Sequence, residues 1–164
     1  MIKVGIISDT HSTFDDKVMR FLDPVDVIWH AGDIGDIATA ERISAFKPLV
    51  AVYGNIDDYV VRSAYRNDCV MFDAEGAKVL MTHIGGYPGN YSSSFLNKIV
   101  AGRPTIVITG HSHILKVMWD KRFGHLHINP GAAGMNGFHR VRTAVRMVID
   151  GGEPRDFEVG EWNR

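Results

Sequence analysis

The sequence contains a single cysteine, Cys69, so no disulfide can form within the chain. It also lacks an excess of either charge, because 18 Lys and Arg residues and 19 Asp and Glu residues leave a net charge of -1. The basic residues are scattered except for a group near the end, at Arg140, Arg142 and Arg146. This distribution argues against a nucleic-acid polymer as a partner.

No apolar run approaches the ~18 residues that a membrane-spanning helix needs. The opening residues MIKVGIISD reach an acidic residue too early for a secretory signal. We therefore expect a cytoplasmic protein without a membrane partner. What is present is ordinary for a globular protein: 45% hydrophobic and 23% charged residues in a chain of 164, which predicts one domain over residues 1–164 with a substantial core. The sequence leaves open whether the chain forms a homo-oligomer.

Short apolar runs rich in valine and isoleucine predict strands that are buried on both faces. They lie at 2–8, 25–30, 49–54, 77–83 and 105–110. Amphipathic stretches between several of them predict helices, as where Ile37, Ala40 and Ile43 share one face. After residue 110 the pattern is β only. Two packed sheets with helices outside them follow from this order.

Two alternating segments predict solvated sheet faces. In the long segment 140–150, Arg140, Arg142 and Arg146 alternate with apolar residues and are expected to face water. His125 and His127 alternate with apolar residues as well, which favours a solvated face over metal ligation.

Polar side chains follow all five buried strands. In chain order they are Asp9, His11, Asp33, Asn55, His83, His111 and His113. Because the carboxyl ends of strands in an open α/β sheet form one crevice, we expect these side chains to converge. Each has a simpler explanation when taken alone, since Asp9 and Asp33 could cap helices and His83 could be a core histidine. Their coincidence at five strand ends favours a metal site.

Carboxylates, imidazoles and an amide without any thiolate suit manganese, iron, nickel or zinc. Seven ligands are too many for one ion, so we expect two divalent ions ~3.5–4 Å apart, which share one carboxylate. Such a pair lowers the pKa of a bridging water and holds both oxygens of an in-line displacement at phosphorus. The pattern therefore predicts hydrolysis of a small phosphoester by attack of a metal-bridging hydroxide.

The ordered motifs SDTH (8–11), AGDIGD (31–36), GNID (54–57), TH (82–83) and GHSH (110–113) resemble those of the calcineurin-like metallophosphoesterases. The short length and NPGA at 129–132 are similar to the small prokaryotic YfcE-like phosphodiesterases. The resemblance implies an α/β fold, a four-layer α-β-β-α sandwich of two mixed sheets flanked by helices. It implies two divalent ions, for which we expect manganese, with nickel, iron or zinc as alternatives. The first would be held by Asp9, His11, Asp33 and His113, and the second by Asp33, Asn55, His83 and His111, with Asp33 bridging.

The sequence departs from the family at Ile56, where many relatives carry a histidine that protonates the leaving group. Isoleucine cannot donate a proton, so we expect better activity on activated aryl diesters than on alkyl monoesters. Nearby candidates for holding the ligands or contacting substrate are Asp57, His30, Tyr87 and Asn129. Asp57 could orient a liganding histidine or cap the segment that follows it.

Gly85, Gly86 and Gly89 indicate either a mobile loop, which would bring Tyr87 and Tyr91 to the substrate mouth, or a plain turn. Two functions stay open. The first is a phosphodiesterase or phosphomonoesterase. The second is a protein-interaction scaffold, because the retromer scaffold subunit has a fold that resembles the one expected here and has lost catalytic competence. All seven ligands are present here, which favours the enzyme.

Overall fold

The computed structural model describes residues 1–164 and contains two five-stranded sheets. The first has the order β10-β9-β1-β2-β3 and is built from β1 (Ile2–Ile7), β2 (Val27–His30), β3 (Leu49–Ala51), β9 (Val141–Asp150) and β10 (Glu153–Asn163). The second has the order β4-β5-β6-β8-β7 and is built from β4 (Cys69–Ala74), β5 (Ala77–Thr82), β6 (Ile106–Ile108), β7 (Leu115–Asp120) and β8 (His125–Pro130). Each sheet joins parallel strands to antiparallel neighbours, so both are mixed, as predicted.

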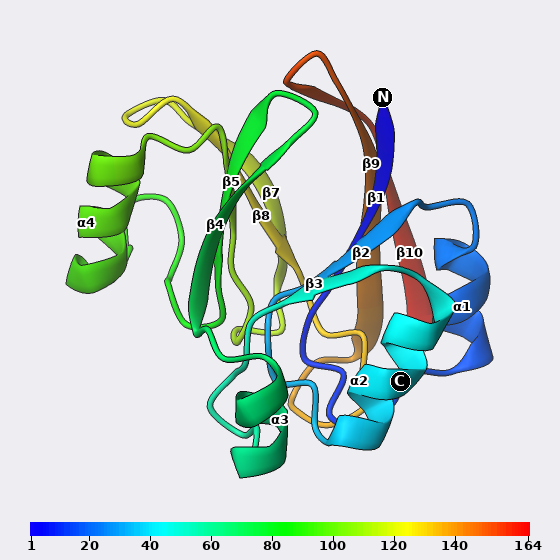
Figure 1. Ribbon diagram of the computed structural model, residues 1–164. Helices are drawn as coiled ribbons and strands as arrows, with labels where there is room; N and C mark the ends of the chain where they lie inside the picture. The colour runs from blue at the N-terminus through cyan, green and yellow to red at the C-terminus, as the bar shows by residue number, and fades with distance from the viewer.

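The chain has four helices, α1 (Asp16–Leu22), α2 (Ile37–Phe46), α3 (Tyr59–Ala64) and α4 (Ser93–Gly102), and α1, α2 and α4 cover the outer faces of the two sheets. Figure 1 shows α1 and α2 beside one sheet, α4 on the far side of the other, and α3 at one end of the molecule. The layer order is thus α-β-β-α, which confirms the predicted sandwich. None of these helices combines the length and the apolar character needed to cross a membrane.

The main core lies between the sheets because successive side chains of a strand point to opposite faces. From β1, Val4 and Ile6 enter a cluster of 14 buried residues between the sheets. Ile7 points the other way and packs against Val18 and Leu22 of α1. Each fully buried side chain of this kind contributes about 1.5–3 kcal/mol. Strands with apolar contacts on both faces read as continuous hydrophobic runs, which is the pattern seen in the sequence.

Arg142 contradicts the prediction of a solvated face on β9. Its side chain is fully buried, and its Nη1 and Nη2 donate to the Asp15 carboxylate at 2.8 and 3.0 Å. Its Nε donates to the Ala133 carbonyl at 2.8 Å. Basic and apolar residues do alternate between the two faces of β9, but the face that carries Arg142 is covered by α1 and the loop around Ala133. The buried charge is tolerated because it is paired with Asp15 and because each of its three nitrogens makes a hydrogen bond.

His125 and His127 also contradict the prediction of a solvated face, because both are fully buried. The Tyr91 hydroxyl lies 2.9 Å from His125 Nε2 and 2.8 Å from His127 Nδ1. The segment before α4 therefore covers this face of β8, and Tyr91 does not serve the substrate mouth. Burial lowers the pKa of His127 to about 3, so this imidazole is neutral.

Candidate metal centre

The predicted ligands lie in loops that follow the carboxyl ends of strands from both sheets. The loops after β1, β2 and β3 carry Asp9, His11, Asp33 and Asn55, and those after β5 and β6 carry His83, His111 and His113. The prediction treated these strand ends as one sheet edge, whereas the crevice lies where the two sheets meet. Exposure is graded across it, because Asp9, Asp33 and His83 are at most 3% exposed while Asn55 and His111 are open to solvent.

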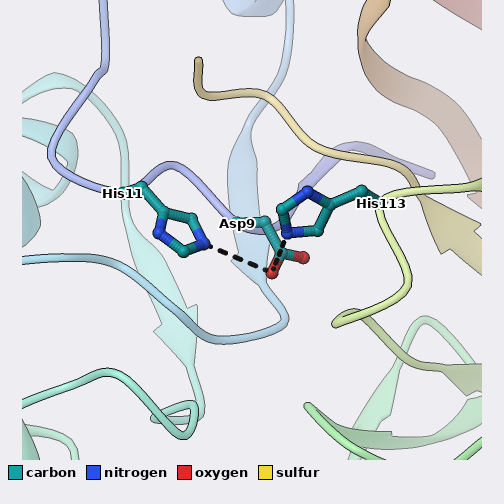
Figure 2. A group of neighbouring side chains, drawn as sticks. All are labelled: Asp9, His11 and His113. Atoms are coloured by element: carbon teal, nitrogen blue, oxygen red, sulfur yellow. Dashed lines mark hydrogen bonds and ion pairs between the residues drawn. The ribbon is translucent and has the colours of Figure 1, made fainter. Parts of the chain in front are cut away.

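The first group of ligand atoms comes from Asp9, His11 and His113 and lies within 4.8 Å. Figure 2 shows both imidazoles directed at the Asp9 carboxylate. Its Oδ1 is 3.1 Å from His113 Nε2 and 3.8 Å from His11 Nε2. One carboxylate oxygen and two imidazole nitrogens thus converge on one point.

The second group comes from Asp33, His83 and His111. Asp33 Oδ2 lies 3.2 Å from His83 Nε2 and 3.4 Å from His11 Nε2, which belongs to the first group. This carboxylate oxygen therefore stands between the two groups, in the place that a bridging ligand needs. Asn55 Oδ1 lies 3.1 Å from His111 Nδ1 and adds an amide oxygen at the exposed end.

Asp9 and Asp33 are not helix caps, which was the simpler explanation for each. Asp15 caps α1 and Asp36 caps α2. Asp9 and Asp33 instead adopt left-handed backbone conformations, with φ of 54° and 57°. His11, His111 and His113 do so too, at 45°, 72° and 61°. Such conformations cost about 1–3 kcal/mol each and cluster at functional sites, where the surrounding fold enforces them.

Buried ring nitrogens without hydrogen-bond partners provide the test of whether these residues fit a cation. His11 Nε2 and His83 Nε2 are both of this kind. His83 Nδ1 donates to the Ala31 carbonyl at 2.8 Å, so its Nε2 presents a free lone pair to the Asp33 carboxylate. Lone pairs facing carboxylates in a buried site are costly unless a cation lies among them. The donor set therefore fits divalent metal ions.

Without a metal ion, protons on the histidines provide part of the positive charge that the carboxylates need. The Asp33 and Asp9 carboxylates, 3.4 and 3.8 Å from His11 Nε2, raise the pKa of His11 to about 9. Burial alone would raise the pKa of Asp9, but the imidazoles of His11 and His113 hold it well below its usual range. The pKa of Asp33 is likewise lowered, because His11 and His83 outweigh its burial.

His30 and Asn129 hold the ligand-bearing loops. His30 Nδ1 accepts from the Gly32 amide at 3.1 Å, so its Nε2 donates to Thr10 Oγ1 at 2.9 Å. Burial lowers the pKa of His30 to about 4. Asn129 Nδ2 donates to the Gly110 carbonyl at 3.1 Å and to Ser112 Oγ at 3.0 Å, which fixes the GHSH turn.

Asp57 serves neither of its two expected roles. Its carboxylate accepts backbone amides from Ile34 at 3.2 Å, Gly35 at 2.9 Å and Gly54 at 2.7 Å. The cap of α3 is Asp58. Asp57 thus ties the loop that carries Asp33 to the loop that carries Asn55.

His139 is a residue of this site that sequence reasoning missed. Its Nε2 lies 2.8 Å from the Gly134 carbonyl and its Nδ1 lies 3.1 Å from His113 Nδ1. A carbonyl only accepts, so His139 Nε2 carries the proton and Nδ1 accepts from His113. Burial lowers the pKa of His139, which keeps the ring neutral. With a metal ion bound, His113 would thereby present an unprotonated Nε2; without one, Nε2 lies 3.1 Å from Asp9 Oδ1 and donates to that carboxylate. No local motif marks His139, because it lies 26 residues from His113.

Ile56 and Tyr87 lie at the open side of the crevice. The Ile56 amide donates to Asp33 Oδ1 at 3.0 Å, whereas its side chain is 44% exposed. Tyr87 is also 44% exposed, and the Lys116 ammonium lies 4.5 Å from its ring centroid. Gly54 packs so tightly on Asp33 that any Cβ there would collide with its carboxylate, which explains the glycine before Asn55.

Comparison with known proteins identifies relatives over nearly the whole chain. A family model described as the calcineurin-like phosphoesterase superfamily domain matches residues 2–152. A probable metallophosphoesterase from Methanothermobacter thermautotrophicus is 26% identical over 163 residues, which cover 95% of this chain and 90% of that protein.

Two solved structures show the same fold. Wild-type Vps29 from Entamoeba histolytica, in complex with zinc, superposes with a TM-score of 0.74 at 17% identity and covers 99% of each chain. A structure described as a novel archaeal phosphodiesterase has a TM-score of 0.73 at 22% identity and covers 96% of this chain and 99% of that one.

Proposed function

The chain belongs to the calcineurin-like phosphoesterase superfamily, and on that premise we propose that it hydrolyses phosphodiesters with two divalent metal ions. The observation that carries the proposal is the Asp33 carboxylate oxygen between His11 Nε2 and His83 Nε2, two buried nitrogens without hydrogen-bond partners. A single oxygen between two such nitrogens suits a ligand shared by two ions. Bound ions would polarise the phosphoryl oxygens and lower the pKa of a water between them.

The chain's own residues orient this centre and leave one side open to substrate. Asp9, Asp33 and His83 form the buried floor, while Asn55 and His111 reach solvent. A small phosphoester would therefore approach from the side of Asn55 and His111. The donor set of carboxylates, imidazoles and one amide supports manganese, with nickel, iron and zinc as alternatives.

Ile56 supports activated diesters as the preferred substrates. It occupies the position at which many relatives carry a proton donor, and its side chain is apolar and exposed. Without a proton from this position, the departing oxygen leaves best when its alcohol is acidic. The similar structure described as an archaeal phosphodiesterase also supports a diester. The single thiol, Cys69, supports a cytoplasmic location.

Hydrolysis after metal loading tests the proposal. Protein freed of metal with a chelator is loaded with manganese, nickel or zinc and supplied with bis(p-nitrophenyl) phosphate and p-nitrophenyl phosphate. We expect turnover of the diester to exceed that of the monoester and to disappear with the chelator. The reverse order would make the protein a phosphomonoesterase. Metal binding without turnover of either ester would favour the scaffold function.

A further inference from the structure

A hollow of about 380 Å³ opens directly beside His111, on the side away from Asn55. It lies between the loop 84–87 and the turn 110–114, with β7 and β8 beneath. Its volume is in the range of pockets that hold small molecules. No step of the proposed hydrolysis uses this hollow, so its purpose is a separate question.

Apolar side chains form the rim of the hollow. Ile84, Tyr87 and Ile114 are 52%, 44% and 63% exposed and belong to its lining. Large apolar side chains on a surface are costly when they gather, and their grouping around a concave site is typical of a ligand-binding wall. The rim therefore favours a ligand with an apolar or aromatic body.

The buried side chains in the floor of the hollow, His127 and Asn129, already have hydrogen-bond partners within the chain. His127 and Asn129 are 0% and 4% exposed. His127 Nδ1 is bound to the Tyr91 hydroxyl at 2.8 Å. Asn129 donates to Gly110 and Ser112 and accepts from the Gly131 amide at 3.0 Å. Recognition of a charge must therefore come from another residue.

Lys116 supplies that charge. Its Nζ lies 4.5 Å from the Tyr87 ring centroid, at the edge of the hollow. It takes part in none of the chain's ion pairs. The aromatic face holds the ammonium in place without neutralising it. An unpaired cation next to an apolar wall favours a ligand whose apolar body ends in an anion.

A second hollow, of about 180 Å³, lies on the other side of Ile84 and includes Asn55 and His83. It contains one charge of each sign, Arg62 and Asp68. The Arg62 guanidinium is already engaged, since Nε donates to the Asp57 carbonyl at 2.7 Å and the group lies 4.8 Å from the Tyr53 ring centroid. Candidate ligands thus line both hollows, and only the larger one presents an unengaged cation.

Building on the proposed function, we propose that the larger hollow binds one substituent of the phosphodiester, and that this substituent has an apolar or aromatic body ending in an anion that pairs with Lys116. A diester has two substituents, and the smaller hollow remains for the other. Substrate selection then lies with Lys116, Tyr87 and the two isoleucines rather than with the metal ligands.

Binding of phosphonates tests this assignment without relying on turnover, because their carbon–phosphorus bond resists hydrolysis. The probes are methylphosphonate, benzylphosphonate and 4-carboxybenzylphosphonate, titrated by calorimetry into zinc-loaded protein. We expect affinity to rise in that order. In nitrogen–proton correlation spectra, the two aromatic probes should shift the amides of Gly86, Ile114 and Lys116.

Variants separate the charge from the apolar wall. Lys116→Met should weaken 4-carboxybenzylphosphonate about fivefold, the size of a partly exposed ion pair, and leave benzylphosphonate unchanged. Ile114→Ser should weaken both aromatic probes. Lys121→Met, on the exposed turn after β7, is the matched control and should change neither.

The assignment would be overturned if Lys116→Met preferred 4-carboxybenzylphosphonate over benzylphosphonate by the same factor as wild type does. Amide shifts that the aromatic probes cause only on other surfaces of the protein would overturn it as well. The outcome is distinct from that of the proposed function. If the protein hydrolyses no ester but still prefers 4-carboxybenzylphosphonate in a manner that depends on Lys116, the proposed enzyme activity is rejected and the hollow stays a binding site. If the protein hydrolyses diesters but shows no such preference, only the proposed role of the hollow is rejected.

Discussion

His139 Nδ1 lies 3.1 Å from His113 Nδ1, and the Gly134 carbonyl on the far side of His139 determines which ring carries the shared proton. His139 Nε2 must donate to that carbonyl, so His113 must donate from Nδ1. Without a metal ion, His113 Nε2 donates to Asp9 Oδ1 at 3.1 Å, and a bound cation would take the place of that proton. A similar arrangement holds His83, whose Nδ1 donates to the Ala31 carbonyl. Backbone carbonyls thus set the tautomer of ligands in both groups.

Replacing His139 should weaken metal binding. Loss of an outer partner of a metal-bound histidine typically costs 10–100-fold in affinity, so we expect His139→Ala to lose about that much in a zinc titration. His139→Gln should recover part of the loss, because its amide oxygen can accept from His113 Nδ1. Asn136→Ala, in the same exposed loop, is the control. Nitrogen chemical shifts of the His113 ring should report a mixed tautomer in His139→Ala; an unmixed tautomer with native affinity would refute the role.

Metal affinity should increase with pH up to about 9. The pKa of His11 is raised to about 9 by the nearby Asp33 and Asp9 carboxylates, and a cation must displace this proton. The pKa of His83 is also raised, because Asp33 and Asp9 outweigh the effect of its burial. Calorimetric zinc affinity that stayed constant between about pH 6 and about pH 9 would contradict these raised pKa values.

The stability of the metal-free protein should change with pH in the opposite direction. A raised folded-state pKa at His11 stabilises the fold fully below the ordinary value of 6.5, and this contribution is lost as pH rises through about 9. The free energy of unfolding in urea should therefore fall over that interval. His11→Asn should remove most of the fall, whereas an unchanged pH dependence in this variant would assign it to other groups.

Ile56→His should flatten the dependence of rate on leaving-group acidity. A histidine there could protonate the departing oxygen, an effect worth about 10²–10⁴-fold for poor leaving groups. We expect the gain to be largest for alkyl esters and small for p-nitrophenyl esters. Ile56→Leu is the control of similar volume. The same slope in Ile56→His and wild type would mean that another group already donates the proton or that chemistry does not limit the rate.

Arg142→Met should lower the free energy of unfolding by about 1–3 kcal/mol near neutral pH, because it removes the partner of the one-third exposed Asp15 carboxylate and leaves the Ala133 carbonyl without its donor. Pairing with Arg142 lowers the pKa of Asp15 despite its burial. The stabilisation is therefore present above the ordinary value of 3.8 and is lost as pH falls through the lower folded-state pKa. Urea unfolding at neutral pH and at about pH 3 should show the difference between variant and wild type shrinking in acid. A difference that is equal at both pH values would contradict the pairing.

Arg142 also illustrates why part of the fold was predictable and part was not. Strands with two buried faces carry their own signal in continuous apolar runs, so the strands and the sandwich followed from the sequence. What covers a polar face depends on segments far away in the chain. Asp15 covers Arg142 from 127 residues away, and Tyr91 covers His125 and His127 from α4's leading segment. The alternation of polar and apolar residues within a strand therefore cannot show which distant segment will cover its polar face.

In the candidate site, too, some features could be predicted from the sequence and others could not. Its ligands stand at strand ends, where topology brings them together, so their convergence could be predicted. The partners that orient them could not. His139 belongs to an irregular loop, and Asp57 binds amides of two different loops rather than a histidine. Only the folded backbone determines which lone pair each histidine presents.

Metal titration of two ligand variants tests the central claim, a centre of two ions that share Asp33. Asp33 Oδ2 lies between His11 and His83 of the two groups, whereas the Asn55 side chain is hydrogen-bonded to His111 of the second group. We predict that wild type binds two ions per chain, that Asn55→Ala keeps both and weakens one, and that Asp33→Asn weakens both. Calorimetry with zinc and manganese measures the stoichiometry and both affinities. Two ions bound by Asp33→Asn with near-native affinity would contradict the shared ligand and the mechanism that depends on it.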